Sequence, residues 1–205
     1  MQKKHFSKKT WAYFSSLIPQ AETWRLYDYF KEDAVFLDIE TTGILDGRLV
    51  MIGLYDGITT KTMIQNINLD IKYLQEELKK YKIIITFNGA TFDIPFLKKN
   101  YPGLIPDIPL VDLKTMCNRV GLTGGLKEIE KQLNIKREDT IVQHMYGGDP
   151  LLLWRKFWAT GDEYFLNLLV SYNNEDIINL KTIADSITKK LKDHHFKQTI
   201  ETIIK

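Results

Sequence analysis

The chain has 205 residues, of which 44% are hydrophobic and 26% charged, and its formal net charge is +2. This is ordinary globular composition, and the length suits one α/β domain with small additions. The single cysteine, Cys117, excludes an intramolecular disulfide, and no run of about 18 uncharged apolar residues marks a membrane span. Because the N-terminus also lacks the apolar segment of a signal peptide, we expect a cytoplasmic protein.

A helical extension and three strands are predicted for the first part of the chain. Residues 1–33 are rich in aromatic side chains, and we expect them to form helices that pack on the main fold. Apolar runs at 34–40, 48–57 and 61–68 predict strands, and the short turns between them favour an antiparallel meander. The next segment, 70–81, has apolar residues at helical spacing and predicts an amphipathic helix.

Strands and helices alternate in the rest of the chain. The β-branched run at 82–89 has the composition of a central strand that is covered on both faces. Further apolar patterns predict a helix at 91–100, a strand at 109–113, helices at 114–120 and 125–133, and a longest helix at 163–192.

The fold class expected from this order of elements is α/β, with a mixed central sheet of about five strands and helices on both faces. We divide the chain into a helical N-terminal extension at 1–33, a main domain at 34–195 and a C-terminal helical tail at 196–205.

Carboxylates interrupt the apolar pattern at three places. Asp38 and Glu40 lie two residues apart on the first strand, so their side chains point to the same face. At a separation of roughly 6–7 Å, two such charges repel by about 2.5 kcal/mol at an effective dielectric constant near 20. Asp93 begins a helix just beyond the central strand, and Tyr172 and Asp176 lie four apart on one helix face.

Four carboxylates that meet at one edge of a sheet require a cation. Hard oxygen ligands in this number select Mg²⁺ or Mn²⁺. Two such ions side by side promote in-line attack on a phosphodiester, because one activates water and both neutralise charge on the phosphate. The sequence therefore predicts a two-ion site made by Asp38, Glu40, Asp93 and Asp176.

The segments around these acids resemble a known family. "FLDIETTG", "FNGATFDIPFL" and "YNNEDIINL" resemble the three motifs of the DEDD 3′–5′ exonucleases of the ribonuclease H-like superfamily, the third in its Tyr-x-x-x-Asp form. More narrowly, "GGLKEIEKQLNIKR" and residues 152–180 resemble the bacterial YprB-like ribonuclease H-like family. The resemblance covers about 34–190. It implies a ribonuclease H-like fold and an exonuclease that acts on single-stranded DNA or RNA.

The resemblance also implies a role for each motif residue. Asp38 would bridge both ions, and Glu40 and Asp176 would complete the site of the ion that carries the nucleophile. Asp93 would hold the second ion through water. Tyr172 would position the attacking water, since a pKa near 10 makes its hydroxyl a poor general base at neutral pH.

A histidine subclass of the same family uses His-x-x-x-x-Asp in place of the tyrosine motif. His144 and Asp149 have this spacing. However, two glycines and a proline in the same segment interrupt any helix that would align the pair. The tyrosine subclass, with Tyr172 and Asp176, is therefore favoured.

Four residues near the motifs are candidates for substrate binding, and each has a structural alternative. Thr41 and Thr42 flank the acids but also end a strand. Asn88 can contact a sugar or phosphate, but Asn-Gly also marks a turn. Phe92 can stack on a terminal base, although a core phenylalanine is the favoured interpretation.

Other polar residues keep two interpretations at this stage. Lys127 and Arg137 can contact the phosphates of a substrate. Exposure on a helix and in a loop explains the presence of these two charged residues equally well. Asp112 ends a predicted strand, where it can support the acids, and Cys117 is interpreted as a buried structural thiol.

Two further functions stay open: a ribonuclease H-like module that binds nucleic acid without turnover, and a metal-dependent endonuclease.

Overall fold

The computed structural model describes residues 18–43, 47–137, 142 and 149–204. A single mixed sheet lies at its centre, with the strand order β3-β2-β1-β4-β5. β1, β2 and β3 form an antiparallel meander, whereas β4 runs parallel to β1 and β5 parallel to β4. The strands are β1 (Ala34–Thr41), β2 (Leu49–Tyr55), β3 (Thr60–Ile64), β4 (Ile83–Thr86) and β5 (Leu110–Asp112). The predicted mixed sheet and its antiparallel meander are confirmed.

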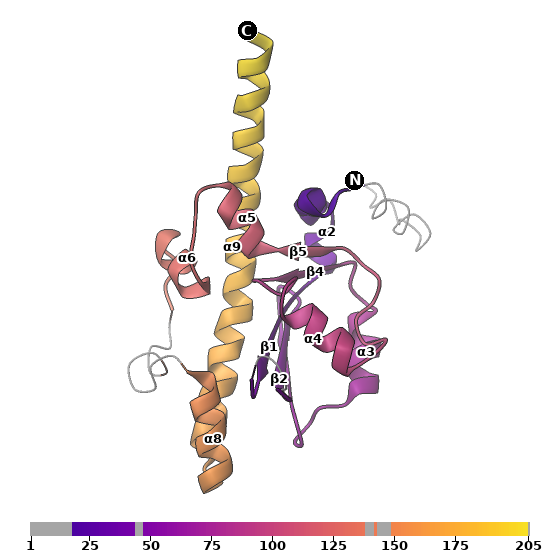
Figure 1. Ribbon diagram of the computed structural model, residues 1–205, viewed down its shortest axis with the longest axis vertical. Helices are drawn as coiled ribbons and strands as arrows, with labels where there is room; N and C mark the ends of the chain where they lie inside the picture. Colours follow the sequence, from indigo (N-terminus) through magenta and orange to yellow (C-terminus); the bar gives the residue numbers. More distant parts are fainter. Residues whose placement is uncertain (1–17, 44–46, 138–141, 143–148, 205) are drawn as a thin grey trace.

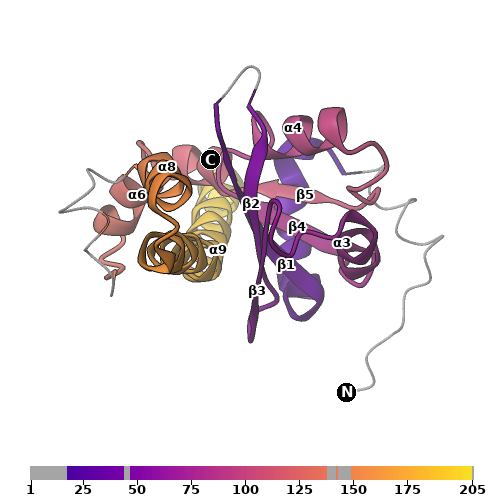
Figure 2. The same cartoon turned by 90° about the horizontal axis from the view of Figure 1, so that it is seen from below.

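Helices cover both faces of this sheet, as predicted. Figure 2 shows α3 and α4 on the opposite side of the sheet from α8 and α9, and Figure 1 shows α9 as one long helix beside the strands. The α-helices are α2 (Tyr27–Phe30), α3 (Ile71–Leu78), α4 (Asp93–Asn100), α5 (Leu113–Arg119), α6 (Leu126–Gln132), α8 (Pro150–Thr160) and α9 (Glu163–Ile204). None of the described helices combines the length and apolarity that a membrane span requires.

The alternation of side chains along β1 determines where its two acids point. Val35, Leu37 and Ile39 are buried in the core that contains α3 and α4 residues. Phe36 is buried on the other face, in the core that contains α9 residues. Because alternate side chains of a strand share a face, Asp38 and Glu40 continue the face of Phe36 and point toward α9.

The described part of the N-terminal extension packs on the main fold. It consists of 3₁₀ turns at Gln20–Leu26 and Lys31–Asp33 on either side of α2. Trp24 and Tyr27 are buried in the α9-side core, and the Tyr27 hydroxyl donates a hydrogen bond to Asp185 on α9 (2.9 Å). Residues 1–17 lie outside the described residues, and the division into three segments stays a prediction.

Several element ends differ from the predicted ones for local reasons. β3 ends at Ile64 because Asn66 has a left-handed backbone (φ 62°) and the Asn68 side chain accepts a hydrogen bond from the Ile64 N–H (2.6 Å). β4 ends at Thr86, two residues before Asn88, which is also left-handed (φ 64°). The longest helix continues past residue 192 to Ile204, so α9 crosses the predicted start of the tail at 196 without a break.

Cys117 is buried in α5, and burial raises the pKa of its thiol to about 12. A thiol with this pKa stays protonated at neutral pH and is a poor nucleophile. The interpretation of Cys117 as a structural residue is supported.

Candidate metal centre

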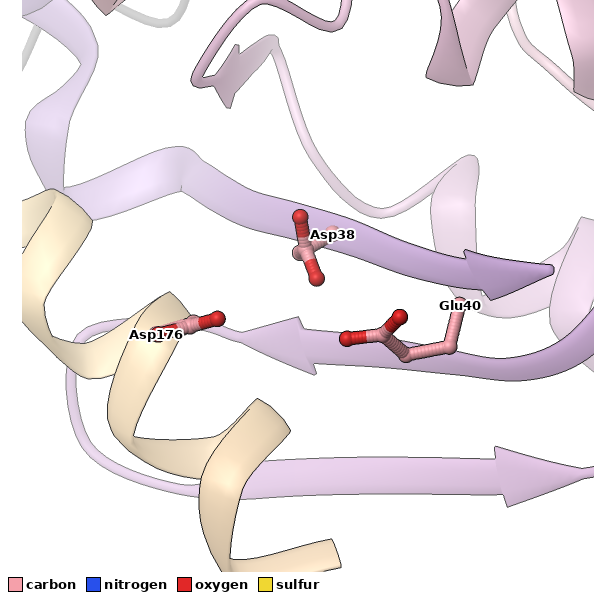
Figure 3. A group of neighbouring side chains, drawn as sticks. All are labelled: Asp38, Glu40 and Asp176. Carbon is pink, nitrogen blue, oxygen red and sulfur yellow. The ribbon is translucent and has the colours of Figure 1, made fainter. Parts of the chain in front are cut away.

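Three acidic side chains from β1 and α9 converge in one cluster. Asp38 and Glu40 come from β1 and Asp176 comes from α9, and one carboxylate oxygen of each lies within 4.8 Å of the others. Figure 3 shows the three carboxylates facing one another between the strand and the helix. The structure therefore brings together three of the four acids that the sequence predicted as ligands.

Burial and mutual repulsion make this cluster electrostatically unfavourable without a cation. Burial, reinforced by Asp176 and Asp93, raises the pKa of Glu40 to about 8. Burial and the charges of Asp93, Glu40 and Asp176 raise the pKa of Asp38 well above its ordinary value. Burial raises the pKa of Asp176 to about 6, although the nearby Arg137 favours its ionised form. Such a cluster is stabilised either by protons or by a bound cation.

Asp93, the fourth predicted ligand, has a different environment. It is the first residue of α4, and its Oδ1 accepts a hydrogen bond from the Ile39 N–H (3.2 Å). Among the described residues, the group of mutually close carboxylate oxygens does not include those of Asp93. Burial raises the pKa of Asp93 to about 7, and its charge raises the pKa values of Asp38 and Glu40. Asp93 therefore adjoins the cluster through the main chain of β1.

Asn173 holds Asp38 in place, and the sequence analysis missed this residue. Its Nδ2 donates a hydrogen bond to Asp38 Oδ2 (2.9 Å), and its side chain is fully buried. The space for the amide exists because position 53 of β2, which pairs with Asp38, is glycine. A Cβ atom on Gly53 would lie 1.9 Å from Asn173 Oδ1 and 3.0 Å from its Cγ. A glycine inside an apolar strand was the available signal for this close approach.

Arg137, for which phosphate contact and an exposed loop were both left open, has a role in the site that neither interpretation included. Its side chain is only 14% exposed and forms an ion pair with Asp176 Oδ1 through Nη2. The same guanidinium contacts both oxygens of Glu130, with Nε 2.6 Å from Oε2 and Nη2 2.8 Å from Oε1. Asn179 on α9 donates a further hydrogen bond to Glu130 Oε1 (2.9 Å). Arg137, in the segment after α6, thus contacts a member of the acid cluster, and Glu130 of α6 holds Arg137.

Tyr172 lies one helical turn before Asp176 and next to two cations. Lys127 Nζ is 4.7 Å from the centre of the Tyr172 ring, and Arg137 Cζ is 5.6 Å from it. Burial and the charges of Asp176 and Glu40 raise the pKa of the phenol far above its ordinary value. The hydroxyl is therefore neutral at physiological pH and can donate or accept a hydrogen bond, but it cannot act as a ready base.

Of the two residues in the histidine alternative, the structure describes only Asp149. His144 lies outside the described residues. Asp149 is exposed and caps α8, with its Oδ1 accepting a hydrogen bond from the Leu151 N–H (2.9 Å). Its charge contributes to the raised pKa of Glu40.

The four candidate substrate-binding residues all have structural contacts. Thr41 Oγ1 donates a hydrogen bond to the Gly43 carbonyl (3.0 Å), and Thr42 Oγ1 accepts one from the Arg48 N–H (2.8 Å). Asn88 adopts a left-handed turn conformation, and Phe92 is half-buried with its ring 6.0 Å from that of Phe96.

Asp112 has a clear structural role. Its carboxylate accepts hydrogen bonds from the backbone N–H groups of Asn88 and Ala90 and caps the start of α5. It thereby fixes the turn that leads into α4 and Asp93, and it supports the site through the backbone.

The raised pKa values predict how stability depends on pH in the absence of divalent ions. A carboxyl whose folded-state pKa exceeds its unfolded value of roughly 4 stabilises the fold only while it is protonated. The pKa values of about 6, 7 and 8 at Asp176, Asp93 and Glu40 therefore predict that the melting temperature in EDTA falls between about pH 5 and pH 8.

Thermal unfolding in EDTA across this pH range measures the effect. Saturating Mn²⁺ should raise the melting temperature most at the high end of the range, since the ligands must be deprotonated. Glu40→Gln should flatten the slope in EDTA. A melting temperature that rises with pH in EDTA would contradict the assigned repulsion.

Comparisons with known proteins agree with this architecture. The family model described as RNase_H superfamily matches residues 35–188. No curated protein matches the chain significantly.

Solved structures also resemble the chain. Brucella melitensis NrnC with bound Mg2+ is 19% identical, with 86% of this chain and 82% of that chain covered and a TM-score of 0.55. The Aedes aegypti Nibbler EXO domain is 13% identical, with 84% and 85% covered and a TM-score of 0.53. At these identities the likeness shows a shared fold.

Proposed function

The chain belongs to the ribonuclease H superfamily, and we propose that it is a metal-dependent 3′–5′ exonuclease that hydrolyses phosphodiester bonds of single-stranded DNA or RNA. The observation that carries the proposal is the convergence of the half-buried Asp38 and Glu40, near the end of β1, with the buried Asp176 of α9. NrnC, which shares the fold, has been solved with Mg2+ and also bound to pGG. These two NrnC structures support a divalent ion and a nucleic-acid substrate for this chain.

The donor set fits Mg²⁺ or Mn²⁺, and the proposal includes two ions per site. The cluster offers carboxylate oxygens from a strand and a helix, and such hard ligands favour these ions. Asp38, Glu40 and Asp176 would hold one ion, and Asp38 with Asp93 would serve the second. Bound ions of this kind lower the pKa of water and neutralise charge on the scissile phosphate.

The other residues of the site act by position. Asn173 orients the Asp38 carboxylate, because its uncharged amide donates a hydrogen bond to Asp38 Oδ2. Tyr172, with its hydroxyl neutral, orients the attacking water and does not take its proton. Thr41, Thr42, Asn88 and Phe92 remain proposed contacts to the terminal nucleotides.

We assign the chain to the tyrosine subclass of the DEDD exonucleases, closest to the YprB-like family. The helical spacing of Tyr172 and Asp176 and the place of Tyr172 beside the cluster support this assignment. The histidine alternative depends on His144, and mutation separates the two.

Replacing Tyr172 by phenylalanine is expected to lower kcat by about 10²-fold, because the water loses a hydrogen bond that orients it. The KM should change little, and Mn²⁺ affinity measured by isothermal titration should stay within about twofold of the wild type. His144→Ala serves as the comparison and should retain most of the activity. If His144→Ala is inactive and Tyr172→Phe is active, the subclass assignment is reversed.

One set of cleavage assays tests the proposed function. DNA and RNA oligonucleotides, single- and double-stranded, carry a label at the 5′ or the 3′ end and are incubated with the protein and Mn²⁺. A 3′–5′ exonuclease produces a ladder from the 5′ label and released mononucleotide from the 3′ label. Internal cuts would indicate an endonuclease. Binding of labelled strands without any cleavage would favour a module that has no turnover.

A further inference from the structure

Arg137 occupies a position from which it can oppose ion binding. Its guanidinium Nη2 contacts Asp176 Oδ1, and the Asp176 carboxylate is one of the three in the cluster. The contact is largely shielded from water, since the Arg137 and Asp176 side chains are 14% and 10% exposed. Arg137 therefore supplies positive charge directly to one of three carboxylates that repel one another, and the charge of Lys127 also acts on Glu40 and Asp176.

Glu130 holds this guanidinium where it is. Glu130 is 2% exposed, and both of its oxygens accept hydrogen bonds from Arg137 in a two-point fork. Asn179 on α9 donates to the same carboxylate, which fixes Glu130 against the helix that carries Asp176. Glu175 Oε2 lies 3.4 Å from Arg137 Nη1. Three contacts other than Asp176 thus keep Arg137 beside the cluster.

We infer that Arg137 is an internal counter-ion of the metal centre, which pairs with Asp176 in the ion-free protein and competes with a divalent ion for that carboxylate. The inference rests on the proposed metal site and adds a residue that sets the ion concentration at which the site fills. Because Glu130 anchors the guanidinium, its positive charge stays close to the cluster when Asp176 binds an ion. The repulsion between two cations then weakens ion binding.

The sign of one substitution separates this role from a structural one. Arg137→Met keeps a long side chain and removes the charge, and we expect it to bind Mn²⁺ about tenfold more tightly than the wild type. A residue that only supports the fold would weaken ion binding when removed. Arg137→Lys keeps the charge and should bind Mn²⁺ within about threefold of the wild type. Arg25→Met is the matched control, because Arg25 pairs with Glu22 outside the site. The Mn²⁺ affinity of this variant should equal that of the wild type.

The experiment is isothermal titration of each full-length protein with Mn²⁺ at one pH, after thermal unfolding has shown that the variant is folded. If Arg137→Met does not fold, Glu130→Gln/Arg137→Gln is compared with Glu130→Gln, and the double variant should bind Mn²⁺ more tightly. If the variant that lacks Arg137 binds Mn²⁺ no more tightly than the protein with which it is compared, the inference is overturned.

The readout distinguishes this inference from the proposed function. Wild-type protein that binds Mn²⁺ without cleaving any strand would contradict the nuclease, while the affinities of the Arg137 variants would still decide the counter-ion role. If the wild type cleaves, the Mn²⁺ concentration for half-maximal activity should also be lower in Arg137→Met. An unchanged concentration would overturn the counter-ion role and leave the nuclease intact.

Discussion

Asp38→Asn is expected to lower the cleavage rate by about 10³-fold or more, because it removes the carboxylate shared by both proposed ions. The same substitution should raise the melting temperature in EDTA at neutral pH. Asp38 is a half-buried carboxyl with a raised pKa, and an uncharged amide relieves its repulsion with Glu40 and Asp176. The asparagine oxygen can still accept the hydrogen bond from Asn173 Nδ2, so the local packing is retained.

Opposite changes in activity and stability are characteristic of a functional cluster that strains the fold. Single-turnover cleavage and thermal unfolding of the same preparation measure both. Asp33→Asn is a suitable control, because Asp33 pairs with Lys82 at the other end of β1 and should not affect cleavage. Retained cleavage in Asp38→Asn would exclude the assigned metal centre, and a lower melting temperature in EDTA would contradict the assigned repulsion.

Gly53→Ala is expected to damage both the fold and the site, although Gly53 carries no chemistry. The new methyl group would overlap Asn173 Oδ1, at 1.9 Å, and lie 3.2 Å from Ile177 Cδ1. Since Asn173 is fully buried, α9 must shift or the amide must leave Asp38. We expect a loss of roughly 1–3 kcal/mol in the free energy of unfolding, as for other overpacked cores. Cleavage should fall about tenfold or more in the variant that remains folded.

Chemical denaturation and cleavage assays of Gly53→Ala measure these effects. Gly125→Ala is the matched control, because a Cβ atom there meets no other atom within 4 Å and the backbone φ is −80°. It should cost less than about 1 kcal/mol, the difference between glycine and alanine at the N-cap of α6. If the two variants are equally stable, the close approach of α9 to β2 is not as the structure describes.

The periodicity of the sequence was sufficient to predict the sheet, because each strand has a clear apolar run and a nearby turn. The alternation of Val35, Leu37 and Ile39 with Phe36, Asp38 and Glu40 also predicted which acids share a face. The ends of β3 and β4 could not be placed this way, since they depend on left-handed backbone at Asn66 and Asn88.

The site was predictable only where its residues fall within motifs. Asp38, Glu40 and Asp176 meet as expected, but Asn173 acts through a close packing that only Gly53 permits. Arg137 follows α6 by several residues, and its contact with Asp176 depends on a tertiary arrangement that local spacing does not encode. Long-range ion pairs of this kind become visible only once the elements are packed.

Anomalous diffraction from a crystal soaked in Mn²⁺ is the decisive test of the metal centre, because it locates the ion without depending on activity. We predict an anomalous peak about 2–2.5 Å from carboxylate oxygens of Asp38, Glu40 and Asp176. The peak should be lost in an Asp38→Asn crystal treated in the same way. An ordered cluster with no peak at saturating Mn²⁺, and with Arg137 still on Asp176, would contradict the assignment of these three acids as a metal centre.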